Sequence, residues 1–288
     1  MLAALFYAAQ GSAASAISVI DPGVASGTLT VKSETIALKH AYAFLCDNAE
    51  GMMDGPELRI LVSDREVPDD TLIGWNSSTR LQPLVREGSV RGVLLKLDPK
   101  APTSGLNGTL LIPSSNPAES LLFFSSKGNN EITKFQDANN RVTGEARYEA
   151  TSSGANQDLP VFKFSFTFSA PLFRDQDISA RLTGPAALRS SPAQALLAFE
   201  RAVREGSLAV AQTMVTSRKW IEIDAHRVQV GDAQFKQMVK QMIPPAATRS
   251  AQIKLVIVRN TRATILINEG GGKTAFSLIQ EQGKWKVD

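Results

Sequence analysis

The sequence has few of the residues on which catalysis and cross-linking usually depend. Its 288 residues include one cysteine, Cys46, and two histidines, His40 and His226. A single cysteine excludes an internal disulfide, and its place in an alternating apolar segment predicts a buried thiol. A nucleophilic role for Cys46 would need a positioned base, for which His40 is the one nearby candidate. Motifs typical of zinc proteases, α/β-hydrolases, thiol redox proteins and nucleotide-binding folds are absent from the sequence.

Long hydrophobic runs are absent too, since no stretch approaches the roughly 20 apolar residues that a membrane-spanning helix needs. The first 16 residues, MLAALFYAAQGSAASA, are apolar and then small, and they end in the A-x-A pattern that signal peptidase accepts before Ile17. No Lys or Arg precedes Lys32, although an export signal normally begins with positive charge, and a truncated or misassigned start would explain this departure. We therefore predict an exported, extracytoplasmic protein, periplasmic or secreted, without stable membrane insertion after cleavage.

Charge is unevenly distributed along a chain of ordinary globular composition. Apolar residues make up 43% of the sequence and charged residues 20%, and the length is sufficient for two domains. Residues 17–183 hold 16 Lys and Arg against 20 Asp and Glu, whereas residues 184–288 hold 15 against 8. A basic surface can attract anions or acidic partners, although a solvated face that keeps the domain soluble is the commoner cause. Nucleic-acid binding is not expected, because the few aromatic residues of the basic half fall at predicted core positions.

A β-rich domain is predicted for residues 17–182. Short segments with β-branched or aromatic residues and a period of two are separated by turn residues. These segments are 28–31, 35–45, 57–64, 90–98, 108–113, 120–126, 131–137 and 142–150. The first two flank a turn at 32–34 and indicate a hairpin, and residues 79–88 form the one plausible helix. The pattern favours an all-β fold, sandwich-like or barrel-like, with one short helix.

The clearest strand is VFKFSFTFSAPLF, in which four phenylalanines alternate with polar residues. Phe162, Phe164, Phe166 and Phe168 therefore lie on one side of a pleated strand. An aromatic floor for a ligand is one explanation of this face, but core packing is far commoner. We expect these rings to cover the core of the β-rich domain.

Three helices and three strands are predicted for the last third of the chain. A linker is expected at 183–191, and Ser191 with Pro192 suits the start of a helix that ends at Gly206. A second helix is predicted over 208–220, and a third begins at Asp232 and stops at the paired prolines Pro244 and Pro245. Three closing strands are expected at 252–258, 263–268 and 274–287. The result is an α+β domain over residues 192–288.

This order of helices and strands resembles the nuclear-transport-factor-2-like or SnoaL-like cone. The segments SPAQALLAFERAVREGSLAVAQTMV, DAQFKQMVKQM and GKWKV carry the resemblance. It implies a curved antiparallel sheet around a pocket used for small molecules or for dimerisation. Enzymatic members set a carboxylate or histidine base opposite a tyrosine, but residues 184–288 contain no tyrosine. The N-terminal segments ETIALKHAYAF and RILVSDREVPDD resemble an uncharacterised family of secreted bacterial β proteins, which brings no activity with it.

The segment 220–226 is the best candidate for chemistry. If it is extended, Glu222, Asp224 and His226 share a face, and a carboxylate beside an imidazole can form a general base or part of a metal site. The alternative is a solvated loop between two helices, with its two isoleucines packed inward. Two other motifs have simpler explanations: Gly270–Thr274 fits a hairpin turn better than a phosphate loop, and Asp69–Asp70 fits a turn with a helix cap.

We predict a non-catalytic ligand-binding or protein-interaction protein, with no metal and no cofactor. The resemblance implies a pocket lined by Phe199, Trp220, Phe235, Met238 and Phe276. Its partner would be a small apolar ligand or a protein, including a second copy bound through the C-terminal sheet. The competing hypothesis is a small isomerase or hydrolase that acts in the cone with Asp224 or His226 as base.

Overall fold

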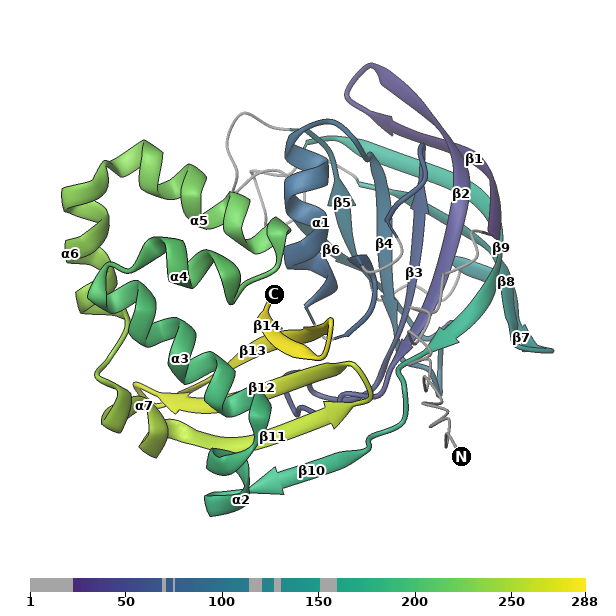
Figure 1. Cartoon of the computed structure of the whole chain (residues 1–288). Helices are drawn as coiled ribbons and strands as arrows, with labels where there is room; N and C mark the ends of the chain where they lie inside the picture. Colours follow the sequence, from purple (N-terminus) through teal and green to yellow (C-terminus); the bar gives the residue numbers. More distant parts are fainter. Residues whose placement is uncertain (1–22, 69–70, 75, 114–120, 127–130, 151–159) are drawn as a thin grey trace, which may run out of the picture.

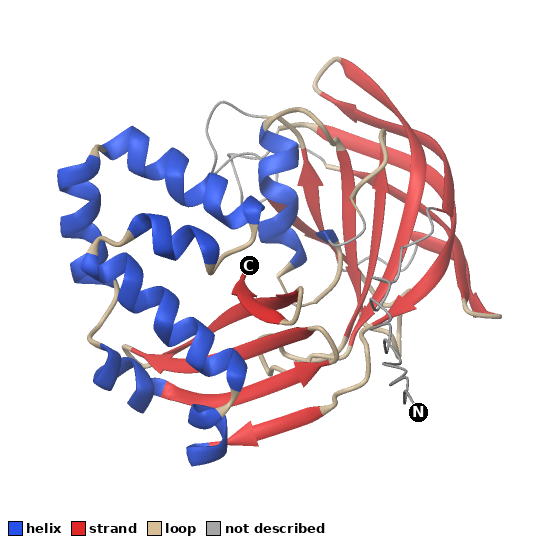
Figure 2. Cartoon of the chain, viewed as in Figure 1, coloured by secondary structure: helices blue, strands red, loops and turns tan. Residues whose placement is uncertain are grey.

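The chain folds into two antiparallel sheets with helices on one side, as Figures 1 and 2 show. The computed structural model describes residues 23–68, 71–74, 76–113, 121–126, 131–150 and 160–288. The predicted signal segment and Asp69–Asp70 lie outside these ranges. Among the described residues the fold is mixed α/β, with seven helices. None of these helices is both long enough and apolar enough to cross a membrane.

The first sheet has nine strands in the order β6-β5-β4-β3-β2-β1-β9-β8-β7. Its strands are β1 (Gly23–Val31), β2 (Glu34–Cys46), β3 (Glu57–Ser63), β4 (Gly92–Leu97), β5 (Leu106–Leu111), β6 (Leu121–Ser126), β7 (Ile132–Ala138), β8 (Arg141–Glu149) and β9 (Phe162–Arg174). Neighbours are antiparallel, and β2 also makes a short parallel pairing with β9. The predicted first hairpin is confirmed, with its turn after Val31.

This sheet curls around a core of aliphatic and aromatic side chains. The four phenylalanines of β9 are each at most 3% exposed, which confirms that they face the core. Phe124 of the edge strand β6 reaches across to Tyr148 of β8, with ring centroids 5.1 Å apart. Gly108 of β5 makes room for the Phe124 ring, because a Cβ there would lie 2.5 Å from it. The curl therefore brings the edge strand β6 against β8 and β9 over one shared core.

Helix α1 (Ser77–Arg86) covers the other face of the first sheet. It buries Leu81 and Val85 against a smaller cluster that includes Tyr42, Leu61 and Leu94. The Tyr42 hydroxyl accepts a hydrogen bond from the backbone N–H of Val67 at 2.9 Å, so this buried polar group is satisfied. The one predicted helix of the β-rich part is thus confirmed within two residues.

The second sheet has five strands in the order β10-β11-β12-β13-β14. They are β10 (Ala180–Thr183), β11 (Ile253–Arg259), β12 (Arg262–Glu269), β13 (Gly272–Glu281) and β14 (Lys284–Val287). The first two predicted closing strands are confirmed as β11 and β12, whereas the third is divided by a turn at Gly283 into β13 and β14. Gly270 and Gly271 have positive φ in the β12–β13 hairpin turn. The glycine-rich segment is therefore a turn between strands, as expected.

Six helices accompany the second sheet, instead of the three expected. They are α2 (Gly184–Arg189), α3 (Ser191–Glu205), α4 (Leu208–Thr213), α5 (Ser217–Val230), α6 (Asp232–Met242) and α7 (Ala246–Gln252). The predicted linker contains α2, whose Ala187 is fully buried, and Ser190 rather than Ser191 caps α3. The predicted second helix is interrupted because Val215 forms a β-bridge with Val287. Neither the three-helix cone nor the division into two linked domains is confirmed.

Both faces of the second sheet are covered at its centre. Helices α2, α3 and α7 pack on one face, where Val256, Ile265 and Leu278 contribute to the core. On the other face Ile257 and Leu266 are 0% and 6% exposed. A homodimer formed through this sheet stays a prediction. Because the centre of both sheet faces is covered, a second copy would have to pair with the edge strand β10.

Candidate functional site

The segment 220–226 is helical, so the expectation of an extended strand or loop is wrong. It lies inside α5, which begins where the Thr216 hydroxyl accepts a hydrogen bond from the backbone N–H of Lys219 at 3.3 Å. Two ion pairs at a spacing of three residues support the helix: Lys219 with Glu222 at 2.9 Å and Asp224 with Arg227 at 2.8 Å. The two ion pairs and the Thr216 cap favour a helix here, although the alternation of apolar residues suggested an extended segment.

In the helix the three candidate residues no longer share a face. At 100° per residue Glu222 and His226 lie one turn apart, while Asp224 points about 200° away from Glu222. Glu222 and His226 are exposed, and His226 contacts the ring of Phe235 edge-on, with centroids 6.4 Å apart. The Asp224 carboxylate is held by Arg227. These groups do not form a general base within a closed pocket.

Four of the five residues predicted to line a pocket belong to the hydrophobic core or pack against it. Phe199 and Phe235 belong to the buried core under the helices, and Trp220 and Phe276 pack against it. Met238 is half-buried on α6. The Arg249 guanidinium carbon lies 5.5 Å from the centre of the Phe276 ring, an additional cation–π contact. These positions describe an apolar core with a charged edge.

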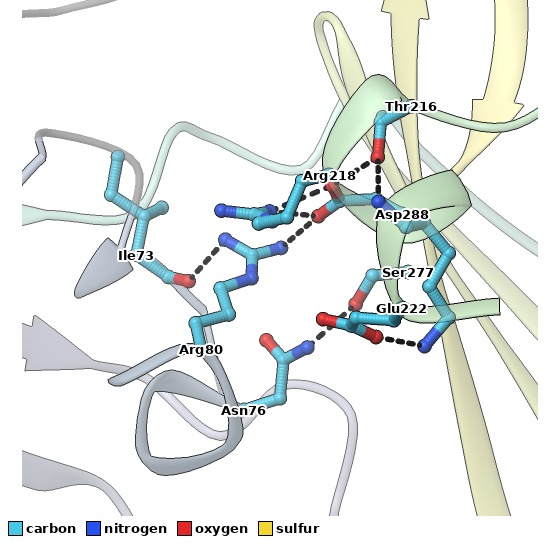
Figure 3. Close-up of polar contacts among 9 residues, drawn as sticks. Ile73, Asn76, Arg80, Thr216, Arg218, Glu222, Ser277 and Asp288 are labelled. Carbon is cyan, nitrogen blue, oxygen red and sulfur yellow. Dashed lines mark hydrogen bonds and ion pairs between the residues drawn. The ribbon is translucent and has the colours of Figure 1, made fainter. Parts of the chain in front are cut away.

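Polar groups meet instead between the two sheets. We call this region the polar seam and define it by Asp47, Glu50, Arg80, Asp175, Arg259 and Asp288. Figure 3 shows one end, where Arg80 from α1 and Arg218 from α5 both point at the Asp288 carboxylate. The shortest N–O distance is 2.7 Å for each arginine, and the Thr216 hydroxyl bonds to the same carboxylate at 3.1 Å. Burial alone would raise the pKa of Asp288, but the two arginines outweigh it and lower the pKa.

Arg259 forms the other end of the polar seam. Its guanidinium donates to both carboxylate oxygens of Asp47, at 2.7 and 2.8 Å, and to the backbone carbonyl of Gln176 at 2.6 Å. The buried Glu50 lies 3.8 Å from the Arg259 Nε. The arginine comes from the second sheet and its acceptors come from segments that follow β2 and β9. This end therefore ties the two sheets together through charge-assisted bonds.

Asp175 is a carboxylate of the polar seam whose charge is only partly compensated. Burial raises the pKa of Asp175 to about 6, although Arg259 and Arg262 pull it down, and the nearby Glu50 and Asp47 raise it further. Within the described part of the chain its Oδ2 atom has no hydrogen-bond partner. The adjoining cavity, lined in part by Glu50, Asp175 and Arg259, has a volume of about 30 Å³. It can hold a water molecule but no organic ligand.

Two larger hollows could accept a small molecule. One of about 580 Å³ lies against β1, β8 and β9, and the chain beside it continues into residues that the structure does not describe. The other, of about 460 Å³, lies between α3, α6 and the start of α7. Among the described residues, no group of three or more His, Cys, Asp and Glu is arranged to hold a metal ion.

The buried thiol expected for Cys46 is confirmed at the end of β2. Burial raises the pKa of Cys46 to about 11, and the positive charge of Arg59 on β3 opposes the shift. A thiol with this pKa is almost fully protonated at neutral pH and is a poor nucleophile. His40 is half-buried on the same strand, and in the β2–β3 register it lies opposite Ser63 of β3.

Comparisons with protein-family models, with curated proteins and with solved structures find no match for this chain. The resemblance to the cone fold therefore stays a prediction. Sequence reasoning missed the polar seam, although one signal was present. Arg259 occupies the same side of β11 as the buried Ile257, and a charged residue on an apolar face is buried only when it is paired.

Proposed function

We propose that this protein is an exported, non-catalytic binding protein whose C-terminal sheet and helices form the ligand-binding part. The observation that carries the proposal is the divergence of Asp224 and His226 on an exposed helix beside a core packed with apolar side chains. A general base needs a substrate within hydrogen-bond reach and out of bulk water. The second condition is not met on the outer side of α5, where Glu222 and His226 are exposed.

Binding without chemistry needs only a preformed hollow with a few polar groups. Hollows of about 300 to 1,000 Å³ are typical of small-molecule sites. The hollow of about 460 Å³ falls in this range, and the buried ion pair of Glu200 with Arg249 and the bonds from Arg204 to the end of α6 fix its surroundings. The proposed export rests on the signal-like pattern of the first 16 residues. We also propose that the C-terminal helices and sheet are related to the cone fold, on the basis of the sequence resemblance.

Native mass spectrometry of the whole chain, expressed in a bacterium that exports proteins, tests the proposal. We expect a mass that begins at Ile17 and a fraction of molecules with a bound organic compound that is released unchanged. The paired variants Asp224→Asn and His226→Ala should carry the same compound. If the wild type converts the bound compound and either variant does not, the competing isomerase or hydrolase activity would be established instead.

A further inference from the structure

We propose that the hollow between α3, α6 and the start of α7 binds a small organic anion with an apolar body. This inference rests on the proposed binding function and names its site and ligand class. The side chains around the hollow come from helices and from the α6–α7 connection, and none comes from a strand of the second sheet. The site is therefore distinct from the interior that a cone-type pocket would use.

The floor of the hollow is apolar and preformed. Leu197 of α3 forms one part of it and is 8% exposed in the folded chain. Pro244 and Pro245 form another part, at the point where α6 ends. Proline has a fixed φ and no backbone N–H, so this wall is rigid and offers no backbone donor from these two residues. An apolar body can dock here without a large loss of backbone entropy.

One wall is fixed by a buried network. Arg204 donates to the backbone carbonyls of Lys240 and Ile243, which holds the end of α6 against α3. Glu200 is bonded to Arg249 at 2.9 Å, and both side chains are at most 6% exposed. The negative charge of Glu200 is thus balanced by a neighbouring guanidinium. Burial raises the pKa of Glu200, with Arg249 opposing this shift.

Two cations at the opening remain for a ligand. Arg201 and Lys240 are exposed, and neither has an ion-pair partner among the residues that the structure describes. Glu205 is the one carboxylate on the same rim with no ion-pair partner among the described residues, so the rim carries an excess of positive charge. An anionic head group would bond to Arg201 and Lys240 while its apolar part lies on Leu197 and the prolines.

Paired fluorescent probes test both parts of this inference. The anion 1-anilinonaphthalene-8-sulfonate and its uncharged analogue N-phenyl-1-naphthylamine share the same rings and differ in the sulfonate. Titration of the whole chain should give a Kd about tenfold lower for the anion. Arg201→Ala combined with Lys240→Ala should raise the anion's Kd about tenfold and leave that of the neutral probe unchanged. Glu205→Gln should lower the anion's Kd, because it removes the opposing charge.

Two further variants act as controls. Lys39→Ala combined with Lys284→Ala removes two exposed cations elsewhere and should leave both titrations unchanged. Ala246→Phe should fill the hollow and weaken both probes, and thermal unfolding of each variant checks that the fold is retained. Unchanged anion binding in the Arg201 and Lys240 double variant, or equal loss of both probes in it, would overturn the inference. If this variant still carries the compound found by native mass spectrometry, the binding function stands and only this site fails.

Discussion

Replacement of Asp175 by Asn should stabilise the protein at neutral and alkaline pH. The carboxylate is buried in the polar seam, and the pKa of Asp175 is raised to about 6 from an ordinary value of 3.8. This difference corresponds to about 3 kcal/mol of preference for the protonated form in the folded state. Because the side chain retains partial exposure, solvent screening reduces the expected effect to about 1–3 kcal/mol.

The sign of the pH dependence follows from the raised pKa. Between pH 4 and pH 6 the folded state binds more protons at Asp175 than the unfolded state does, so its contribution to stability is greatest below pH 4 and is lost as pH rises through 6. Asp175→Asn keeps a neutral side chain at every pH. The variant should match the wild type at pH 4 and exceed it at pH 8.

Urea unfolding at a series of pH values from 4 to 8 measures this difference. Asp177→Asn, two residues away and exposed, is the matched control and should follow the wild type throughout. The reasoning fails if Asp175→Asn is less stable than the wild type at pH 8. That result would mean that the ionised carboxylate is a favourable partner of Arg259 and Arg262 despite its burial.

Three other substitutions probe the core, the polar seam and the discarded catalytic candidate. Phe166→Ala should lower the free energy of unfolding by about 3–5 kcal/mol, against little change for the exposed Ser165→Ala, and equal values for both would place Phe166 outside the core. Asp288→Ala should cost about 3–5 kcal/mol in urea unfolding at pH 7, because two arginines lose their shared carboxylate. This cost should shrink as pH falls through the lowered pKa of Asp288, and a cost that grew as pH fell would refute the electrostatic cause. His226→Ala should leave the melting temperature and the probe Kd unchanged, and loss of binding would restore His226 as a site residue.

Elements with strong local signals were predictable from the sequence. The alternation of Phe162 to Phe168 predicted the core face of β9, and Gly206 predicted the end of α3, where it adopts a φ of 79°. The prolines after α6 likewise predicted its end. In each case one short stretch of chain specifies both the element and its boundary, so no tertiary information was needed.

Elements that depend on distant partners were not predictable. Val215 interrupts the helix after α4 because it pairs with Val287, more than 70 residues later, and Thr216 then caps a new helix over the candidate residues. The alternation in Trp220–His226 suggested an extended segment, but capping and ion pairs outweighed it. The partner of Arg259 is Asp47, directly after β2 and more than 200 residues earlier in the chain, which no sequence spacing indicates.

The most direct measurement is a titration of the isotope-labelled chain with 1-anilinonaphthalene-8-sulfonate, followed by amide proton–nitrogen NMR. Binding in the proposed hollow predicts shifts confined to the second half of α3, the end of α6 and the start of α7. The competing apolar surface is the outer side of α5, where Ile221 and Val228 are 68% and 70% exposed. Shifts centred on Ile221 and Val228, with the amides of Arg201 and Lys240 unchanged, would contradict the proposed site.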